Sequence, residues 1–276
     1  MQRDRGSQGV GPEAARPEVD PNVPQSARVY DFLLGGKDNF GADRAVGAAL
    51  IENVPALPLM VRAQRAFLAR AVRYLVADAG IRQFLDIGTG IPTANNVHEV
   101  AQEIAPEARV LYVDNDPIVL AHARALMTGS PAGKTAFIQA DLREPESILA
   151  DPTLSETLDL TQPVALMLVG ILMHLHDADD PYGIVSTLMD ALPSGSYLTL
   201  THPSADFDPP AMAGLAAAAE QSGIPYVPRS RAETERFSAG LDLVDPGVVP
   251  ILGWRPDEPP DDVNSVYGWA SVARKP

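Results

Sequence analysis

The sequence predicts an α/β fold built on a doubly wound, mostly parallel sheet of seven strands. We expect an antiparallel strand at the C-terminal end and a helical cover at the N-terminus. A buried strand, a glycine turn and a helix follow one another between residues 81 and 105. Further strand segments then alternate with helix-length segments, which is typical of parallel sheets. The last two strand segments, 241–250 and 265–273, have no helix between them, which favours antiparallel pairing.

The first strand-turn-helix unit is the best defined. Ile81–Ile87 is mostly apolar, as expected of a central strand covered on both faces. Gly88 and Gly90 follow directly and permit a tight turn that a ligand can approach closely. Thr93 is the candidate cap of a helix over 94–105, whose apolar residues recur at helical spacing.

The other elements of the core follow in regular order. The remaining apolar strand segments are Arg109–Val113, Thr135–Ala140, Val164–Val169 and Tyr197–Thr201. Aspartate–proline pairs predict helix starts at Asp116 and Asp180, because the aspartate can cap and proline suits the first turn. Two more helices are predicted over 211–222 and 230–239.

The N-terminal part divides into an arm and a cover. Residues 1–24 are rich in Gly, Pro, Arg and Glu, and we expect a flexible arm. Residues 25–80 are predicted to form a cover of three helices, over 27–34, 42–53 and 60–79. Ser26 is the candidate cap of the first helix, and Gly35 is expected to end it.

Length and composition limit the classes of function. With 276 residues we expect one domain over 25–276, with its α/β core over 81–276. The net charge of −15 argues against a nucleic-acid partner, because phosphates would be repelled. The absence of cysteine excludes disulfides and thiolate metal sites. We expect a cytoplasmic protein without membrane association, because neither a spanning segment nor a signal-peptide core is present in the sequence.

Acidic residues end three of the predicted parallel strands. Asp86, Asp114 and Asp141 follow the first, second and third strands, and ligands of such sheets bind at the carboxyl ends of the strands. Asp114 has the spacing from the glycine turn that suits a ribose hydroxyl. Asp141 could accept a hydrogen bond from an adenine amino group, with the Leu142 backbone beside it. Asp86 could order the turn or meet a cationic tail.

The pattern favours a nucleoside over a dinucleotide. Dinucleotide sites use G-x-G-x-x-G, but Thr93 stands where the third glycine belongs. Three acids in one pocket would also repel a pyrophosphate. S-adenosylmethionine is cationic and carries no phosphate, so it fits the predicted pocket. An NAD(P)-dependent oxidoreductase is therefore a disfavoured alternative.

These residues also carry a resemblance to known proteins. The motifs at 84–93, 110–117 and 137–142 resemble those of class I S-adenosylmethionine-dependent methyltransferases, which implies a Rossmann-like sheet. The segments that resemble the bacterial "S-adenosyl methyltransferase" family, long catalogued as a domain of unknown function, are Ala27–Arg44, Phe84–Asn95, Val110–Ala125 and Asp141–Pro145. The resemblance implies that the methionine end is bound by Asp86, Gly88 and Gly90, and the adenosine by Asp114, Asn115, Asp141 and Leu142. Thr89, between the two glycines, is also a candidate cofactor-binding residue.

Candidate acceptor-side residues lie in the cover and after the fourth strand. Tyr30, His174 and His176 are the candidate catalytic residues, and His202 is a weaker candidate. The cover residues expected either to line the pocket or to close it structurally are Tyr30, Gly35, Lys37, Asp38 and Asn39. The run from His174 to Asp179 suggests a metal site, but its spacing is one residue off, so we expect no metal.

Two functional hypotheses remain open from the sequence. The first is a methyltransferase that uses S-adenosylmethionine and a small-molecule acceptor. The second is an S-adenosylmethionine-binding protein without catalysis, because no residue is recognisable as a catalytic base from its motif alone.

Overall fold

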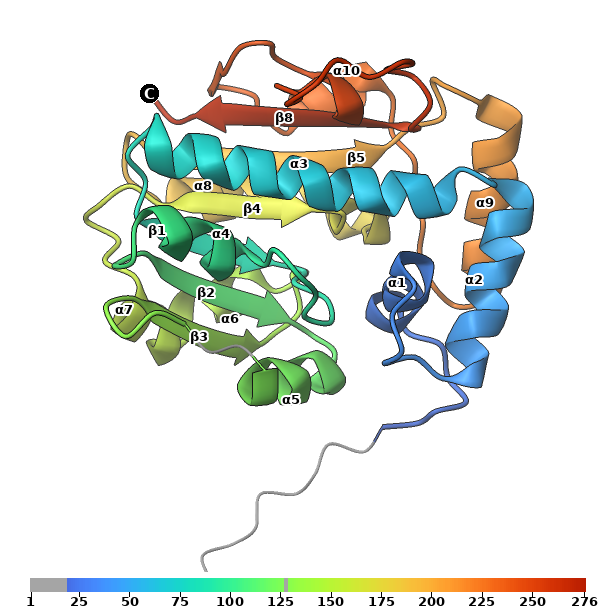
Figure 1. Cartoon of the computed structure of the whole chain (residues 1–276), viewed down its shortest axis with the longest axis horizontal. Coiled ribbons are helices and arrows are strands. Elements are labelled where there is room, and N and C mark those ends of the chain that lie inside the picture. The colour runs from blue at the N-terminus through green and yellow to red at the C-terminus, as the bar shows by residue number, and fades with distance from the viewer. Residues whose placement is uncertain (1–18, 127–128) are drawn as a thin grey trace, which may run out of the picture.

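The computed structural model describes residues 19–126 and 129–276, which fold around one sheet (Figure 1). The strand order is β3-β2-β1-β4-β5-β8-β6, with β7 also paired to β8. The strands are β1 Gln83–Ile87, β2 Arg109–Asp114, β3 Lys134–Gln139, β4 Ala165–Val169, β5 Tyr197–Pro203, β6 Asp242–Leu243, β7 Val249–Pro250 and β8 Gly268–Arg274. The strand order reverses between β1 and β4, which confirms the doubly wound fold.

The antiparallel end of the sheet differs in detail from the prediction. Strands β1 to β5 are parallel to one another, and β8 is antiparallel to β5, as expected. The segment 241–250, expected as one strand, forms β6 and β7 instead. A turn closed by the hydrogen bond from Gly247 N–H to the Val244 carbonyl (2.8 Å) separates them. The sheet therefore has eight strands among the described residues.

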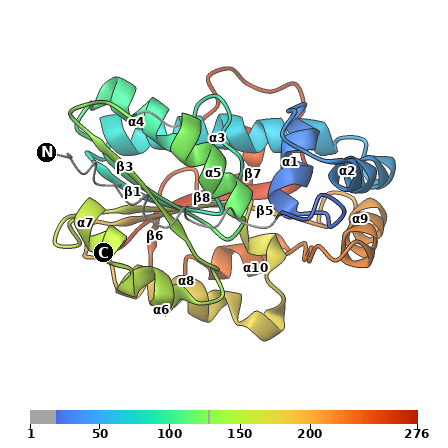
Figure 2. The ribbon, with the colours of Figure 1, turned by 90° about the horizontal axis from the view of Figure 1, so that it is seen from below.

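Helices cover both faces of the sheet (Figure 2). They are α1 Ser26–Leu34, α2 Gly41–Asn53, α3 Leu57–Ala77, α4 Val97–Ile104, α5 Pro117–Leu126, α6 Pro145–Ala150, α7 Pro152–Thr157, α8 Pro181–Asp190, α9 Pro209–Gln221 and α10 Arg231–Arg236. Helices α3 and α4 lie on one face, and α6 and α8 lie on the other. Helices α1, α2 and α9 lie beyond the carboxyl ends of β2 and β4.

Alternation along the strands produces two cores. In β2, Val110 and Tyr112 belong to the core beneath α3 and α4, whereas Leu111 and Val113 belong to the core beneath α6 and α8. Side chains of a strand point to opposite faces in turn, so a strand covered on both sides must be apolar throughout. This arrangement leaves the ends of the strands as the place where polar side chains can gather.

Two predicted helix starts are corrected. Helix α4 begins at Val97, and its cap is Asn96, whose backbone N–H donates a hydrogen bond to the Glu99 carboxylate (2.7 Å). This capping box replaces the expected cap at Thr93, and the positive φ of Asn95 (61°) prevents the helix from starting earlier. Ser26 is the first residue of α1, and Gln25 occupies the cap position.

A buried arginine joins the N-terminal segment to the cover. The Arg28 guanidinium donates to the carbonyls of Asp20 (3.4 Å) and Val23 (2.7 Å). Its Nε lies 3.6 Å from the Asp43 carboxylate of α2 and 3.9 Å from that of Asp116, after β2. Of the predicted arm, Asp20 and Val23 therefore contact Arg28, and residues 1–18 lie outside the described residues.

The loop between α1 and α2 wraps around one buried carboxylate. Asp31 of α1 accepts hydrogen bonds from the Asp38 backbone N–H (2.9 Å) and the Asn39 side-chain amide (2.7 Å). Gly36 lies directly against this carboxylate, where a Cβ would overlap it. The positive φ of Gly35 (82°) ends α1, as predicted.

No single helix in residues 19–126 and 129–276 is both long and apolar enough to cross a membrane. Helices α2 and α3 meet those criteria only as a pair, across a bend of 101°.

We predict that Gly36→Ala destabilises the protein by about 1–3 kcal/mol, because the new methyl group displaces the Asp31 carboxylate or strains the loop. Gly41→Ala is the matched control, since the nearest atom to its Cβ position is 3.9 Å away. Urea unfolding of both variants measures the difference. Equal stability of the two variants would contradict the described packing around Asp31.

Candidate functional site

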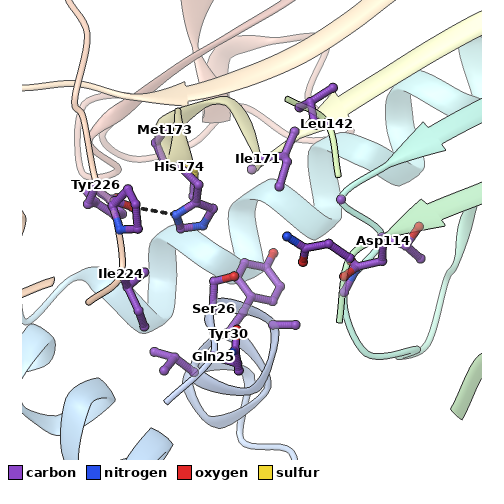
Figure 3. A pocket seen from close by; sticks show the side chains of 18 of the residues that line it. Gln25, Ser26, Tyr30, Asp114, Leu142, Ile171, Met173, His174, Ile224 and Tyr226 are labelled. Carbon is purple, nitrogen blue, oxygen red and sulfur yellow. Dashed lines mark hydrogen bonds between the residues drawn. The ribbon is translucent and has the colours of Figure 1, made fainter. Parts of the chain in front are cut away.

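A cavity of about 500 Å3 lies at the carboxyl ends of β1, β2, β3 and β4. Residues of α1, α3 and the segment after α9 line its other side (Figure 3). Its volume falls in the range of pockets that bind small ligands. The cavity thus occupies the position at which doubly wound sheets bind their ligands.

The turn after β1 forms part of the cavity wall. Gly88 N–H donates to the Val113 carbonyl (2.9 Å), which ties the turn to β2. Gly88 has a φ of +77°, and a Cβ there would lie 2.5 Å from the Ile171 side chain. Gly90 has a φ of +66° and open space where a Cβ would be, so its backbone faces the cavity. Position 88 therefore requires glycine both for its positive φ and for lack of space for a Cβ atom.

Asp114 ends β2 and holds the same turn. Its carboxylate accepts hydrogen bonds from the backbone N–H groups of Gly90 (2.8 Å) and Asp116 (2.9 Å). Burial raises the pKa of Asp114 to about 6, although these hydrogen bonds oppose the rise. A carboxylate offers about four lone-pair sites, so about two remain for the hydroxyl groups of a ligand.

Asp86 lies at the end of β1 and is almost fully buried. Burial raises its pKa to about 7; the Arg65 guanidinium opposes this rise and the Asp114 carboxylate adds to it. The Arg65 guanidinium donates hydrogen bonds to the carbonyls of Ala94 and Asn95 (both 3.1 Å), so it is already bound to the loop after β1. A cationic ligand in the cavity would favour the ionised form of Asp86.

A polar cluster follows β3. Asp141 accepts hydrogen bonds from the Asn115 amide (3.2 Å) and from the Arg143 backbone N–H (2.9 Å). Burial raises its pKa, but these hydrogen bonds and the Arg143 charge outweigh burial and lower it. Leu142 is buried beside this cluster and lines the cavity. Asp141 is therefore ionised, next to an apolar surface.

The structure brings all the predicted cofactor-binding residues to this one cavity. They are Asp86, Gly88, Thr89, Gly90, Asp114, Asn115, Asp141 and Leu142. They come from three neighbouring strand ends, as the parallel topology requires.

His174 lies at the far side of the cavity from Asp114 (Figure 3). It ends the short turn η1 (Leu172–His174), which follows β4. Its Nδ1 lies 2.7 Å from the Pro225 carbonyl, so this nitrogen carries the proton and donates. Burial lowers the pKa of His174, so its ring is neutral at pH 7. The Tyr226 ring packs edge-on against it, with centroids 6.3 Å apart.

Tyr30 projects from α1 between these two ends of the cavity (Figure 3). Its hydroxyl donates to the Val61 carbonyl of α3 (3.2 Å). Burial raises the pKa of Tyr30 to about 12, although the charge of Arg65 opposes this rise. Tyr30 therefore remains protonated at neutral pH and can accept a further hydrogen bond through its oxygen.

The other predicted cover residues lie outside the cavity lining. These residues are Gly35, Lys37, Asp38 and Asn39. The loop that contains them is drawn towards the Asp31 carboxylate of α1. They belong to the cover rather than to the pocket wall. Of the two roles expected from the sequence, they therefore fit the one in which the cover closes the pocket without lining it.

Two of the predicted histidines also lie elsewhere. His176 is exposed, with Nε2 3.5 Å from the Glu220 carboxylate. His202 is fully buried, with Nδ1 3.0 Å from the Pro203 carbonyl and Nε2 3.1 Å from the Arg229 guanidinium. Burial lowers the pKa of His202 to about 3, so it is a neutral structural residue. His174 and His176 do not share a site.

Comparisons with known proteins point to one family. The sequence model of the S-adenosyl methyltransferase family matches residues 12–276. A DUF574 family protein from Streptomyces avermitilis is 46% identical, with a TM-score of 0.90, over 93% of this chain and 99% of that chain. A protein named as a candidate methyltransferase from Thermobifida fusca is 43% identical, with a TM-score of 0.86, over 97% and 99%. A search of curated proteins gave no match.

The chain belongs to the S-adenosyl methyltransferase family. It is an S-adenosylmethionine-dependent methyltransferase, as the strand-end motifs predicted. The missing third glycine had already disfavoured an NAD(P)-dependent oxidoreductase, and the family assignment agrees.

The contribution of α3 to the cavity of this methyltransferase was not apparent from the sequence. Gln64 and Arg65 both line the cavity. Gln64 is buried, and its Oε1 has no hydrogen-bond partner among the described residues. It follows Val61 by three positions and precedes Leu68 by four, so it lies on the apolar face of the helix. A polar residue on a buried face was the signal that could have identified it.

We predict that Asp86→Asn makes the ligand-free methyltransferase about 1–3 kcal/mol more stable at pH 8, with a smaller gain at pH 5. The raised pKa means that folding favours the protonated carboxyl, so the stability from Asp86 is lost as pH rises through about 7. Thermal unfolding at both pH values measures this difference.

Asp141→Asn is the matched control, because the pKa of Asp141 is lowered rather than raised. This variant should gain nothing at pH 8. An Asp86→Asn variant that is equally or less stable than the parent at pH 8 would contradict the buried, neutralised carboxyl.

Proposed function

We propose that this methyltransferase binds S-adenosylmethionine at the strand ends and a small-molecule acceptor beneath the N-terminal cover. The convergence of Asp86, Asp114 and Asp141 with the glycine turn in one cavity carries this proposal. Asp114 would hold the ribose hydroxyls, Asp141 and Leu142 the adenine, and Asp86 with the turn the methionine end.

The lining fits such a ligand in three independent respects. The acids suit a cation that carries no phosphate. The open space above Gly90 allows a ligand to lie against the backbone. The buried Oε1 of Gln64, which has no partner in the described part of the chain, offers an acceptor for an ammonium or amide group.

The chemistry needs alignment more than a strong catalyst. When bound, S-adenosylmethionine supplies a methyl group made electrophilic by its sulfonium. The protein would orient the acceptor and keep water away from the reacting atoms. Helices α1 and α3 and the segment after α9 enclose the cavity for this purpose.

The enclosed position of the cavity supports a small acceptor. Val23, Gln25 and Tyr30 line it from the N-terminal side, over the strand ends. Arg28 holds this N-terminal segment to α2 through Asp43. A macromolecule would have to displace the cover to reach the cavity, whereas a small molecule would not.

We predict micromolar binding of S-adenosylmethionine and S-adenosylhomocysteine, and no binding of NAD⁺, by titration calorimetry. Asp114→Asn should weaken both by roughly 10-fold to 100-fold, because hydrogen bonds to a charged group are lost. Asp190→Asn, an exposed substitution at the end of α8, is the control and should bind as the parent does. Undiminished binding by the Asp114 variant would disprove the assigned ribose site.

A further inference from the structure

The two ends of the cavity differ in charge. Its charged lining residues are Asp86, Asp114, Asp141, Arg65 and Arg143. All of them come from the strand ends or from the α3 position beside Asp86, and the three acids belong to the proposed cofactor site. The arginines are engaged: Arg65 with the loop after β1, and Arg143 with Asp141 (3.2 Å).

The opposite end is uncharged and largely apolar, although Gln25, Ser26 and Ser222 also belong to the cavity lining. Figure 3 shows Met173, His174, Ile224 and Tyr226 grouped there, away from Asp114. The cover adds further apolar lining residues, namely Val29, Leu33, Leu50, Leu57, Met60 and Val61. None of these side chains is charged, so a charged acceptor would lose its hydration here without gaining an opposite charge.

One proton acceptor faces this apolar end. Because Nδ1 of His174 donates to the Pro225 carbonyl, Nε2 carries the free lone pair. No hydrogen-bond partner of Nε2 is found among residues 19–126 and 129–276, yet Nε2 is not sealed from the cavity. Tyr30 and Tyr226 cannot take this role, because burial raises the pKa of both and keeps them protonated.

The backbone on both sides of His174 is fixed. A buried guanidinium, that of Arg229, donates to the carbonyls of Leu172 (3.3 Å) and Leu175 (3.0 Å). Arg143 donates to the carbonyl of His174 itself (3.0 Å). The imidazole is therefore held in one orientation, as a proton acceptor must be.

We propose that the acceptor is an uncharged, largely apolar aromatic molecule with a phenol-type hydroxyl, and that His174 Nε2 takes the hydroxyl proton. This inference rests on the proposed function and names its substrate class. The acceptor oxygen forms a bond to the methyl carbon as its proton passes to Nε2. The carbon–sulfur bond breaks, its electron pair stays on sulfur, and the sulfonium becomes a neutral thioether. The imidazolium then releases the proton to water.

The test uses matched pairs of probes, naphthol with hydroxynaphthoate and hydroxybiphenyl with hydroxybiphenylcarboxylate. Calorimetry with the protein saturated by S-adenosylhomocysteine measures binding, and mass spectrometry measures methyl transfer from S-adenosylmethionine. We expect at least one phenol to bind and to be methylated, and each carboxylate to bind at least about tenfold more weakly than its phenol.

His174→Gln should keep S-adenosylhomocysteine and phenol binding but lower kcat by about 100-fold or more, because glutamine cannot take the proton. His176→Gln is the matched control two residues away, and its kcat should equal that of the parent. Retained cofactor binding shows that a slow variant is folded.

Three results would overturn the inference: carboxylates that bind as well as phenols, phenols that do not bind or react, or a His174→Gln variant with the parent's kcat. Each leaves the proposed cofactor site intact if S-adenosylhomocysteine still binds. Failure of S-adenosylhomocysteine to bind the parent would overturn both proposals together.

Discussion

The hydrogen bond from the Gly90 backbone N–H to the Asp114 carboxylate, 2.8 Å long, joins two neighbouring strand ends. A second bond, from Gly88 N–H to the Val113 carbonyl (2.9 Å), holds the same turn. Together they place the turn of β1 against the acid of β2 before any ligand arrives. Such preorganisation lowers the cost of ordering the site on binding.

Burial gives these acids their electrostatic character. Asp86 and Asp114 lie where the sheet is covered on both faces, and burial raises the pKa of each. The ligand-free site thus holds carboxyls that are partly protonated near neutral pH. A cation restores their charge, so cofactor recognition and the stability of the protein are linked through the same two groups.

The cover completes the site through buried polar contacts. Arg28 connects residues 20–23 with Asp43 of α2 and Asp116 after β2. Asp31 organises the loop that follows α1. Because the charged groups of these contacts lie outside the cavity lining, the cover can present an apolar surface to an acceptor while those groups are satisfied elsewhere.

The fold and the cofactor end could be predicted from the sequence because both follow from local patterns. Apolar strands, the glycine turn and the strand-end acids are each visible within a few residues, and parallel topology brings them together. The acceptor end could not be predicted in this way. Ile224 and Tyr226 meet His174 there only after the segment that follows α9 has packed against the turn after β4.

Local patterns also misplaced some residues. Asn96 rather than Thr93 caps α4, because Glu99 completes a capping box that a single candidate cap does not reveal. Lys37 and Asp38 were among the cover residues expected either to line the pocket or to close it structurally. They lie outside the cavity because Asp31 draws their loop towards α1. His174 lines the cavity, whereas His176, two residues further on, is exposed to solvent.

The position of the cofactor can be seen in a crystal structure of the protein with S-adenosylhomocysteine. We expect the ribose hydroxyls on the Asp114 carboxylate, the adenine beside Asp141 and Leu142, and the sulfur directed towards the end that holds His174. An adenine bound between His174 and Tyr226, with the strand-end acids left free of the ligand, would contradict this expectation.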